Sequence, residues 1–295
     1  MYISIAEILR TTAQGLCGLP YVTLGRTGLN VSLLGLGCGQ ILSKKDKFSE
    51  GVDLVRHALD LGINYFDTAP EYKASESHLG EALYPNRQGL VLASKTHDRT
   101  RDGSWRLLER TLNRLKTDYL DIWQIHHLDY DREVNRIFKD DGAMKALLEA
   151  KEQGLVKYLG ITGHSSPSPL LKALKEYNFD TLLCAINPAD KWDKPFLKEL
   201  IPTAKKKGMG IVGMKICADG SIPKKSGEVN IQNSFNYAIT KGCDIAIIGH
   251  NSIGELDKNI ELARTYKELS NDEMKKLEEL SKPYKKDMLK FRDWK

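Results

Sequence analysis

The chain has 295 residues, of which 41% are hydrophobic and 28% charged, and its net charge is +5. This composition is typical of a soluble globular protein and does not indicate nucleic-acid binding, because nucleic-acid-binding domains are usually more basic and carry their lysines in clusters. Five scattered cysteines without a CxxC pair favour a reduced, cytoplasmic setting, and no apolar run of about 18 residues predicts a membrane helix.

Residues 1–19 are predicted to form an N-terminal arm. Its apolar residues are interrupted by Glu7 and Arg10, which makes it a poor signal peptide, so we expect a short amphipathic segment packed on the domain. Residues 21–32 follow as two extended pieces around a turn that contains glycine, a pattern typical of a β-hairpin. Such a hairpin would suit the bottom of a barrel.

Eight short apolar runs recur along the rest of the chain, with segments of helical spacing between them. Gly62 and Gly154, just past two of these segments, are typical of helix C-caps. A strand–helix unit repeated eight times predicts an α/β fold, the (β/α)8 TIM barrel, whose parallel strands are apolar on both faces. The predicted strands are Leu33–Leu36, Asn64–Asp67, Val91–Ser94, Asp121–His126, Tyr158–Thr162, Thr181–Ala185, Gly210–Met214 and Asp244–Ile248.

After the eighth unit, Asn271–Ser281 is predicted to be an extra C-terminal helix with Ser270 or Asn271 as its N-cap. No low-complexity linker interrupts the chain, so residues 1–295 are predicted to be a single domain. An open Rossmann-type sheet is disfavoured, because the first strand runs into Gly35–Gln40, which lacks the third glycine of a dinucleotide-binding turn.

Polar residues follow the ends of three successive predicted strands, where a barrel carries its active site. Asp67 ends the second strand, Lys95 ends the third and His126 ends the fourth, and Tyr72 lies on the loop after Asp67. Carbonyl reduction requires a cofactor that supplies hydride and an acid that supplies a proton. Tyr72 is predicted to be the acid, with Lys95 lowering its pKa. Asp67 would hold the ammonium charged, and His126 would hydrogen-bond the substrate oxygen or relay the proton.

Several blocks of the sequence resemble the aldo-keto reductase family, most closely its divergent microbial members. The blocks are Gly62–Tyr72 with Ser75-Glu76 and Leu79–Leu83, Ala93–Lys95, Leu115–His126, Gly154–Ile161, and Asn251-Ser252 with Leu256 and Asn259. The resemblance implies that Asp67, Tyr72, Lys95 and His126 are the catalytic tetrad. It also implies a barrel with an N-terminal hairpin that binds extended NAD or NADP without a Rossmann unit. The expected reaction is reduction of an aldehyde or ketone to an alcohol, or the reverse on a sugar or similar polyol.

The same resemblance assigns ten residues to the cofactor. They are Thr162, Gly163, Leu183, Met214, Lys215, Gly249, Asn251, Ser252, Glu255 and Asn259. Four of these positions depart from the family pattern. Thr162-Gly163 stands where many members have Ser-Asn, Leu183 replaces a glutamine, and Met214 replaces the tyrosine that stacks on the nicotinamide. These departures affect the expected contacts to the nicotinamide more than the expected catalytic residues.

The preference between NAD and NADP stays open in the sequence. Gly249 and Glu255 occupy positions where members that prefer NADP place Lys and Arg against the 2′-phosphate. A glutamate there would repel a phosphate, which favours NAD, but His250 and Lys258 are nearby cations that would compensate.

Two other function classes also stay open. The first is a regulatory protein that binds the cofactor with little turnover. The second is a metal-dependent barrel hydrolase with His126, His127, His164 and His250 at the barrel mouth. It is disfavoured because no HxH follows the first strand. We therefore expect no bound metal, a small carbonyl or alcohol substrate, and no nucleic-acid or membrane partner; the sequence does not indicate an oligomeric state.

Overall fold

Eight parallel strands form a closed barrel in the computed structural model, which describes residues 18–222 and 227–293. Each strand pairs with the next along the chain, and the last pairs with the first. This confirms the predicted (β/α)8 TIM barrel and excludes the open Rossmann-type sheet. The strands are β3 (Leu34–Gly37), β4 (Tyr65–Asp67), β5 (Val91–Thr96), β6 (Leu120–Ile125), β7 (Val156–Gly163), β8 (Thr181–Ala185), β9 (Gly210–Met214) and β10 (Ile245–Ile248).

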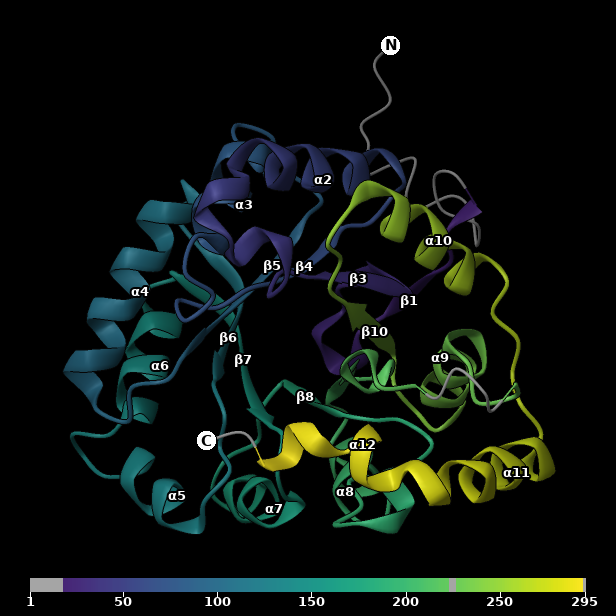
Figure 1. Cartoon of the computed structure of the whole chain (residues 1–295). Coiled ribbons are helices and arrows are strands. Elements are labelled where there is room, and N and C mark those ends of the chain that lie inside the picture. Colours follow the sequence, from purple (N-terminus) through teal and green to yellow (C-terminus); the bar gives the residue numbers. More distant parts are fainter. Residues whose placement is uncertain (1–17, 223–226, 294–295) are drawn as a thin grey trace.

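Helices surround the barrel strands (Figure 1). Gly62 and Gly154, predicted as C-cap glycines, follow the ends of two of them with φ of 92° and 76°. Glycine adopts a positive φ without strain, and this turns the chain out of the helix towards the next strand. The helices are α2 (Phe48–Asp60), α3 (Ser75–Leu83), α4 (Arg101–Leu115), α5 (Asp131–Ile137), α6 (Ala143–Glu152), α7 (Pro167–Glu176), α8 (Leu200–Lys206), α9 (Ile231–Thr240) and α10 (Ile253–Arg264).

Three predicted strand starts, Leu33, Asn64 and Asp244, lie one residue before the observed strands, and two of them are polar. The side chain of Asn64 accepts a hydrogen bond from the backbone N–H of Ser32 at 2.8 Å, and that of Asp244 accepts from the backbone N–H of Ile211 at 2.8 Å. These polar side chains satisfy backbone donors at the N-terminal end of the barrel, so they tie neighbouring strands together instead of extending their own.

The predicted hairpin at residues 21–32 is present and closes the N-terminal end of the barrel. β1 (Tyr21–Thr23) pairs antiparallel with β2 (Asn30–Ser32). Leu24 is fully buried, and the backbone N–H of Arg26 donates to Gly208, just before β9. The opposite end of the barrel is therefore the one left for a site. Residues 1–17 of the predicted N-terminal arm lie outside the described residues.

The apolar core has two layers, as a filled barrel requires. The larger layer lies between the strands and the surrounding helices, while the smaller one fills the barrel and packs against the hairpin. The smaller layer consists of Leu24, Val31, Tyr65, Val91, Ala93, Ile122, Leu183, Val212, Met214, Ile245 and Ile247.

The predicted extra helix is present as α11 (Asn271–Ser281), and Ser270 is its N-cap in a capping box. After α12 (Lys285–Met288), the chain crosses the lower part of the view in Figure 1. Arg292 forms a buried ion pair with Asp190 after β8, and its backbone oxygen accepts from Ser165 after β7 at 2.8 Å. The C-terminal segment is thereby tied to the loops at the open end of the barrel.

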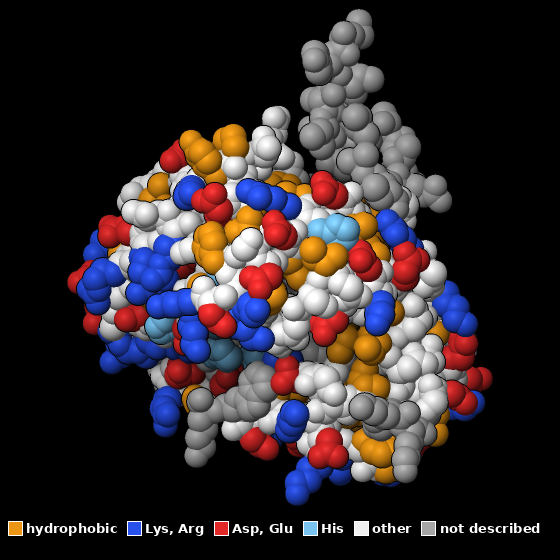
Figure 2. Space-filling model, turned by 45° about the horizontal axis from the view of Figure 1, so that its top comes forward, with side chains coloured by type: hydrophobic (Ala, Val, Ile, Leu, Met, Phe, Trp, Pro, Cys, Tyr) orange, Lys and Arg blue, Asp and Glu red, His pale blue; other side chains and the backbone are white. Residues whose placement is uncertain are grey.

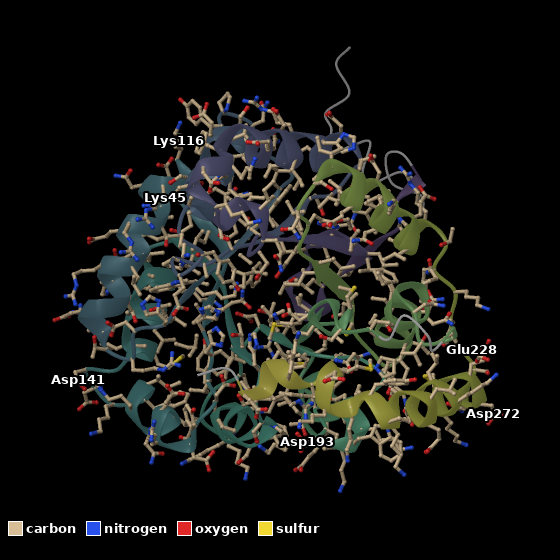
Figure 3. The ribbon with its side chains drawn as sticks, in the orientation of Figure 1. Lys45, Lys116, Asp141, Asp193, Glu228 and Asp272 are labelled. Carbon is tan, nitrogen blue, oxygen red and sulfur yellow. The ribbon has the colours of Figure 1, made fainter. Side chains whose placement is uncertain are left out.

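Charged side chains of both signs are spread over the face of the molecule in Figure 2. Lysines and arginines are interspersed with aspartates and glutamates on the face shown in Figure 2. Lys116, Asp141 and Asp272 lie at the periphery of the ribbon in Figure 3. Among the described residues, no helix combines the length and the apolarity that crossing a membrane requires.

Candidate active site

The four predicted catalytic residues lie close together at the C-terminal end of the barrel. Asp67 ends β4, Lys95 lies near the end of β5, His126 directly follows β6, and Tyr72 lies on the loop after β4. Nζ of Lys95 donates to Oδ1 of Asp67 at 2.6 Å and to the backbone oxygen of Thr68 at 2.6 Å. Lys95 and Asp67 are each 1% exposed, so this is a buried, directly bonded ion pair.

The same ammonium group lies beside the phenol. Nζ of Lys95 is 5.1 Å from the centroid of the Tyr72 ring. The Tyr72 ring in turn meets the His126 ring edge to face, with centroids 5.9 Å apart. An acid, a cation and an imidazole therefore border one point at the barrel mouth, as proton transfer to a bound oxygen requires.

The electrostatics of the phenol differ from the sequence-based expectation. Burial raises the pKa of Tyr72 and Lys95 lowers it, but burial is the larger effect, so the pKa lies above its ordinary value. Burial alone would lower the pKa of Lys95, but Asp67 and Tyr72 outweigh it, so that pKa is raised and the ammonium stays charged. The predicted sign of the Lys95 effect is right, whereas the predicted net lowering of the Tyr72 pKa is wrong.

Gln124 completes the surroundings of Asp67, and the sequence analysis missed it. It lies opposite Lys95 in the pairing of β5 with β6, and its Nε2 donates to Oδ2 of Asp67 at 3.1 Å. Both carboxylate oxygens of Asp67 are therefore engaged. The available signal was the position of Gln124 two residues before His126, because alternate strand residues share a face.

Three histidine rings stack along the mouth of the barrel. The centroid of the His126 ring lies 3.9 Å from that of His127, which lies 4.4 Å from that of His164. Consecutive residues of a strand point to opposite faces, but His127 has φ of 50°, which turns its ring back towards His126. Burial, followed by the proximity of His127, holds the pKa of His126 well below its usual value and lowers that of His164 to about 3.

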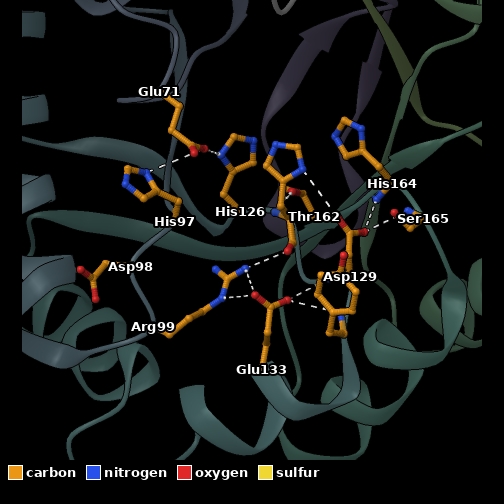
Figure 4. A network of polar contacts seen from close by, with 12 residues as sticks. Glu71, His97, Asp98, Arg99, His126, Asp129, Glu133, Thr162, His164 and Ser165 are labelled. Carbon is orange, nitrogen blue, oxygen red and sulfur yellow. Dashed lines mark hydrogen bonds and ion pairs between the residues drawn. The ribbon is translucent and has the colours of Figure 1, made fainter. Parts of the chain in front are cut away.

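A second carboxylate, that of Glu71, lies beside His126. Its Oε2 lies 2.5 Å from Nδ1 of His126 and 3.8 Å from Nδ1 of His97, and Figure 4 shows the carboxylate between the two rings. The sequence analysis missed both Glu71 and His97, although Glu71 directly precedes Tyr72. Loop residues are not placed by strand alternation, so no sequence pattern pointed to this contact.

A polar network fixes the loop that carries His127. Nη2 of Arg99 donates to the backbone oxygen of His127 at 2.7 Å, and Arg99 forms an ion pair with Glu133 (Figure 4). Oδ1 of Asp129 accepts from the backbone N–H groups of His164 and Ser165 at 2.8 and 2.9 Å. Burial opposes ionisation of Asp129, but the hydrogen bonds outweigh it and lower its pKa to about 2, so the carboxylate is charged at neutral pH.

A cleft of about 850 Å³ extends from these residues to α10. Six of the ten predicted cofactor residues line it: Met214, Lys215, Gly249, Asn251, Glu255 and Asn259. Asp67 and Tyr72 lie at its other end, together with His127 and His164. An extended dinucleotide fits this lining: Lys258 would face its phosphates, and Met214 would offer an apolar contact to a flat ring. Lys215 also lines the cleft, where it is paired with Asp219 at 3.2 Å.

The other four predicted cofactor residues do not line this cleft. Oγ1 of Thr162 accepts from the backbone N–H of His127 at 3.1 Å. A side chain on Gly163 would meet Leu170 of α7, and Leu183 belongs to the barrel interior. Ser252 is the N-cap of α10. Whether they contact a cofactor stays a prediction.

The end of the cleft at α10 carries charges of both signs. Oε2 of Glu255 accepts from the backbone N–H of Asn251 at 2.7 Å, which fixes the carboxylate beside the cleft. Lys258 lines the same region. Burial lowers the pKa of His250 to about 4, so His250 supplies no positive charge here at neutral pH. Lys258 is therefore the cation that opposes Glu255, and the structure leaves the choice between NAD and NADP open.

The histidines considered for a metal-dependent hydrolase do not form one group. Ring contacts join His126, His127 and His164, but within residues 18–222 and 227–293 none reaches His250 after β10.

Comparisons with known sequences agree with this geometry. The model of the aldo/keto reductase family matches residues 33–240. The oxidoreductase YqkF of Bacillus subtilis (strain 168), itself uncharacterized, is 28% identical over 216 residues, which cover 68% of this chain and 66%, just under two thirds, of that relative. L-galactose dehydrogenase of Arabidopsis thaliana is 25% identical over 307 residues, which cover 89% of this chain and 94% of that enzyme.

Solved structures show the same similarity. An aldo-keto reductase from Pseudomonas aeruginosa has a TM-score of 0.70 at 28% identity, over 87% of this chain and 97% of that one. The holo form of aldo-keto reductase AKR11C1 from Bacillus halodurans has a TM-score of 0.75 over 89% of this chain and 96% of that one. Its identity is only 22%, so this second likeness concerns the fold alone.

Proposed function

The chain belongs to the aldo/keto reductase family and is an oxidoreductase, and we propose that it uses NAD or NADP to interconvert a carbonyl compound and an alcohol. One observation carries the proposal. Lys95, held at 2.6 Å by both Asp67 and the backbone oxygen of Thr68, lies 5.1 Å from the Tyr72 ring at the end of the cleft. A buried ammonium beside the ring of a phenol stabilises the phenolate and so favours proton transfer at the phenol oxygen.

Each residue of the group has a distinct role in this proposal. The nicotinamide, when bound, accepts or supplies the hydride. Tyr72 gives its proton to the substrate oxygen during reduction and takes one during alcohol oxidation. Lys95 stabilises the phenolate that forms, and Asp67 holds Lys95 in place. His126 borders the same point and exchanges a proton with the reacting groups.

The walls of the site favour a polar substrate. His127 and His164 line the cleft beside Tyr72, and His97 lies next to Glu71 at the mouth. Imidazoles and carboxylates pair with hydroxyl groups, which suits a small sugar or polyol, or the aldehyde or ketone derived from one. The relative named L-galactose dehydrogenase supports the same substrate class.

A second candidate function is cofactor binding with little turnover. The side chain of Thr162, predicted to hold the nicotinamide, is already occupied by the backbone N–H of His127, and Leu183 is buried in the barrel interior. A weakly held nicotinamide would bind through its adenosine half without reaching a reactive geometry.

Titration of the purified full chain with NADH and NADPH, followed by turnover with sugars, polyols and their aldehydes, separates these candidates. We expect turnover in the wild type and a loss of about 10²-fold or more in Tyr72→Phe at unchanged cofactor affinity. Tyr84→Phe, at an exposed tyrosine outside the cleft, is the matched control. Tight binding without turnover would favour the second candidate, and no binding of either cofactor would contradict both.

A further inference from the structure

The carboxylate nearest the catalytic imidazole belongs to a residue that the proposed reaction does not use. Oε2 of Glu71 lies 2.5 Å from Nδ1 of His126 (Figure 4). His126 is 1% exposed, whereas the side chain of Glu71 is 39% exposed. Glu71 therefore connects a buried ring to solvent.

The bonding of His126 makes this contact important. Within the described part of the chain, neither ring nitrogen of His126 has a hydrogen bond of good geometry. Leaving a buried N–H without an acceptor is costly, and the half-exposed Glu71 carboxylate, 2.5 Å from Nδ1, is the acceptor within reach. The other groups facing His126 are cationic, neutral or phenolic; they are Tyr72, Lys95, His97, His127 and His164. None of them is an anionic acceptor at neutral pH.

We propose that Glu71 is a positioning residue: its carboxylate accepts the Nδ1–H of His126 and keeps the ring in the tautomer whose Nε2 is bare and open to Tyr72. This inference rests on the proposed function and extends it. A neutral imidazole with Nδ1 protonated can only accept at Nε2. His126 therefore takes a proton from the reacting groups, and it does not act as a hydrogen-bond donor to a carbonyl oxygen.

The proton transfers balance in both directions. During alcohol oxidation Tyr72 first passes its proton to Nε2 of His126, which leaves a phenolate beside Lys95. The phenolate then takes the proton of the substrate O–H group, and a bound oxidised nicotinamide would accept the hydride from carbon. The resulting imidazolium is stabilised by the Glu71 carboxylate, as a carboxylate stabilises the imidazolium of a Ser-His-Asp triad. The proton on Nε2 then leaves to water after the product dissociates, so that the ring returns to the Nδ1-protonated tautomer. During reduction each transfer runs in reverse.

Kinetics of Glu71 variants test the inference. We expect Glu71→Ala to lower kcat by about 10- to 100-fold at unchanged KM for the cofactor, because the ring loses its orienting partner. Glu71→Asp should recover most of this loss, and added formate should partly restore kcat in Glu71→Ala. Formate should not restore Tyr72→Phe. The matched control is Glu81→Ala on α3, which removes a half-exposed carboxylate that pairs with Lys116.

Nitrogen-15 NMR of the ring nitrogens provides a readout that does not depend on turnover. Comparison with His126→Asn assigns the signals, and we expect a protonated Nδ1 in the wild type and a shift towards protonated Nε2 in Glu71→Ala. A wild-type proton on Nε2, or a kcat of Glu71→Ala within about twofold of wild type, would overturn the inference. If no carbonyl or alcohol turns over, the proposed function fails. The His126 tautomer observed by NMR in the wild type and in Glu71→Ala would still show whether Glu71 orients the ring.

Discussion

Replacing Lys95 by methionine removes the charge that the proposed reaction needs. Nζ lies 5.1 Å from the Tyr72 ring centroid, and at an effective dielectric constant of about 20 this separation corresponds to about 3 kcal/mol between the ammonium and a phenolate. That energy equals about two pKa units. The pKa of Tyr72, already raised by burial, should therefore rise further in Lys95→Met.

The substitution also leaves a buried charge without its partner. Asp67 is 1% exposed and would keep only the bond from Gln124, so Lys95→Met should cost about 3–5 kcal/mol of the free energy of unfolding. The double variant Asp67→Asn/Lys95→Met removes both charges and should recover most of that stability. It separates the loss of activity from the loss of folded protein.

The pH profile of alcohol oxidation is the decisive assay. Oxidation needs the phenolate, so its rate rises with pH through the pKa of Tyr72. Lys95→Met should move this limb to higher pH by about two units, and the double variant should move it by less, because Asp67 itself raises the pKa of Tyr72. Lys95→Met should lower turnover at neutral pH by about 10²-fold. Urea unfolding measures the stability of each variant in parallel. A stable double variant with near-normal turnover and an unchanged limb would show that Lys95 is only structural.

Three further predictions use other regions of the chain. Tyr72→Phe should bind cofactor normally and reduce carbonyls at least about 10²-fold more slowly; near-normal turnover would remove it as the acid. Glu255→Arg should favour NADPH over NADH by about one to two orders of magnitude, an effect that shrinks with salt, whereas Glu261→Arg on the same helix should leave the ratio of dissociation constants unchanged. Arg292→Met leaves Asp190 buried without its partner and should lower the free energy of unfolding by about 3–5 kcal/mol, measured with urea. An unchanged urea midpoint would show that the Arg292–Asp190 ion pair does not stabilise the fold.

The barrel was predictable because its strands and helix ends follow local rules. The apolar runs mark strands buried on both faces, and Gly62 and Gly154 mark helix ends by a backbone conformation that other residues avoid. The starts of strands were less certain. Asn64 and Asp244 look like strand residues in sequence, but their side chains bond the backbones of neighbouring strands, and such long-range contacts leave no local pattern.

The clustering of three of the four predicted catalytic residues was predictable for the same reason as the barrel. Asp67, Lys95 and His126 lie at the ends of adjacent parallel strands, and the closed sheet brings such ends together. The direction of the Tyr72 pKa shift was not predictable, because it depends on how far burial outweighs the nearby ammonium of Lys95. That balance requires the positions of all the surrounding atoms.

The residues that the sequence did not reveal owe their positions to loop backbone. His127 would point away from His126 if the strand continued, and its φ of 50° brings the two rings together. Glu71 likewise reaches His126 from a loop, over a sequence separation that no periodicity spans. Strand geometry therefore specifies Asp67, Lys95 and His126, while loop geometry specifies Tyr72 and the groups proposed to orient His126. Because loops tolerate substitution better than strands, relatives with this barrel can keep the chemistry of Tyr72 and Lys95 while the partner of the catalytic imidazole changes.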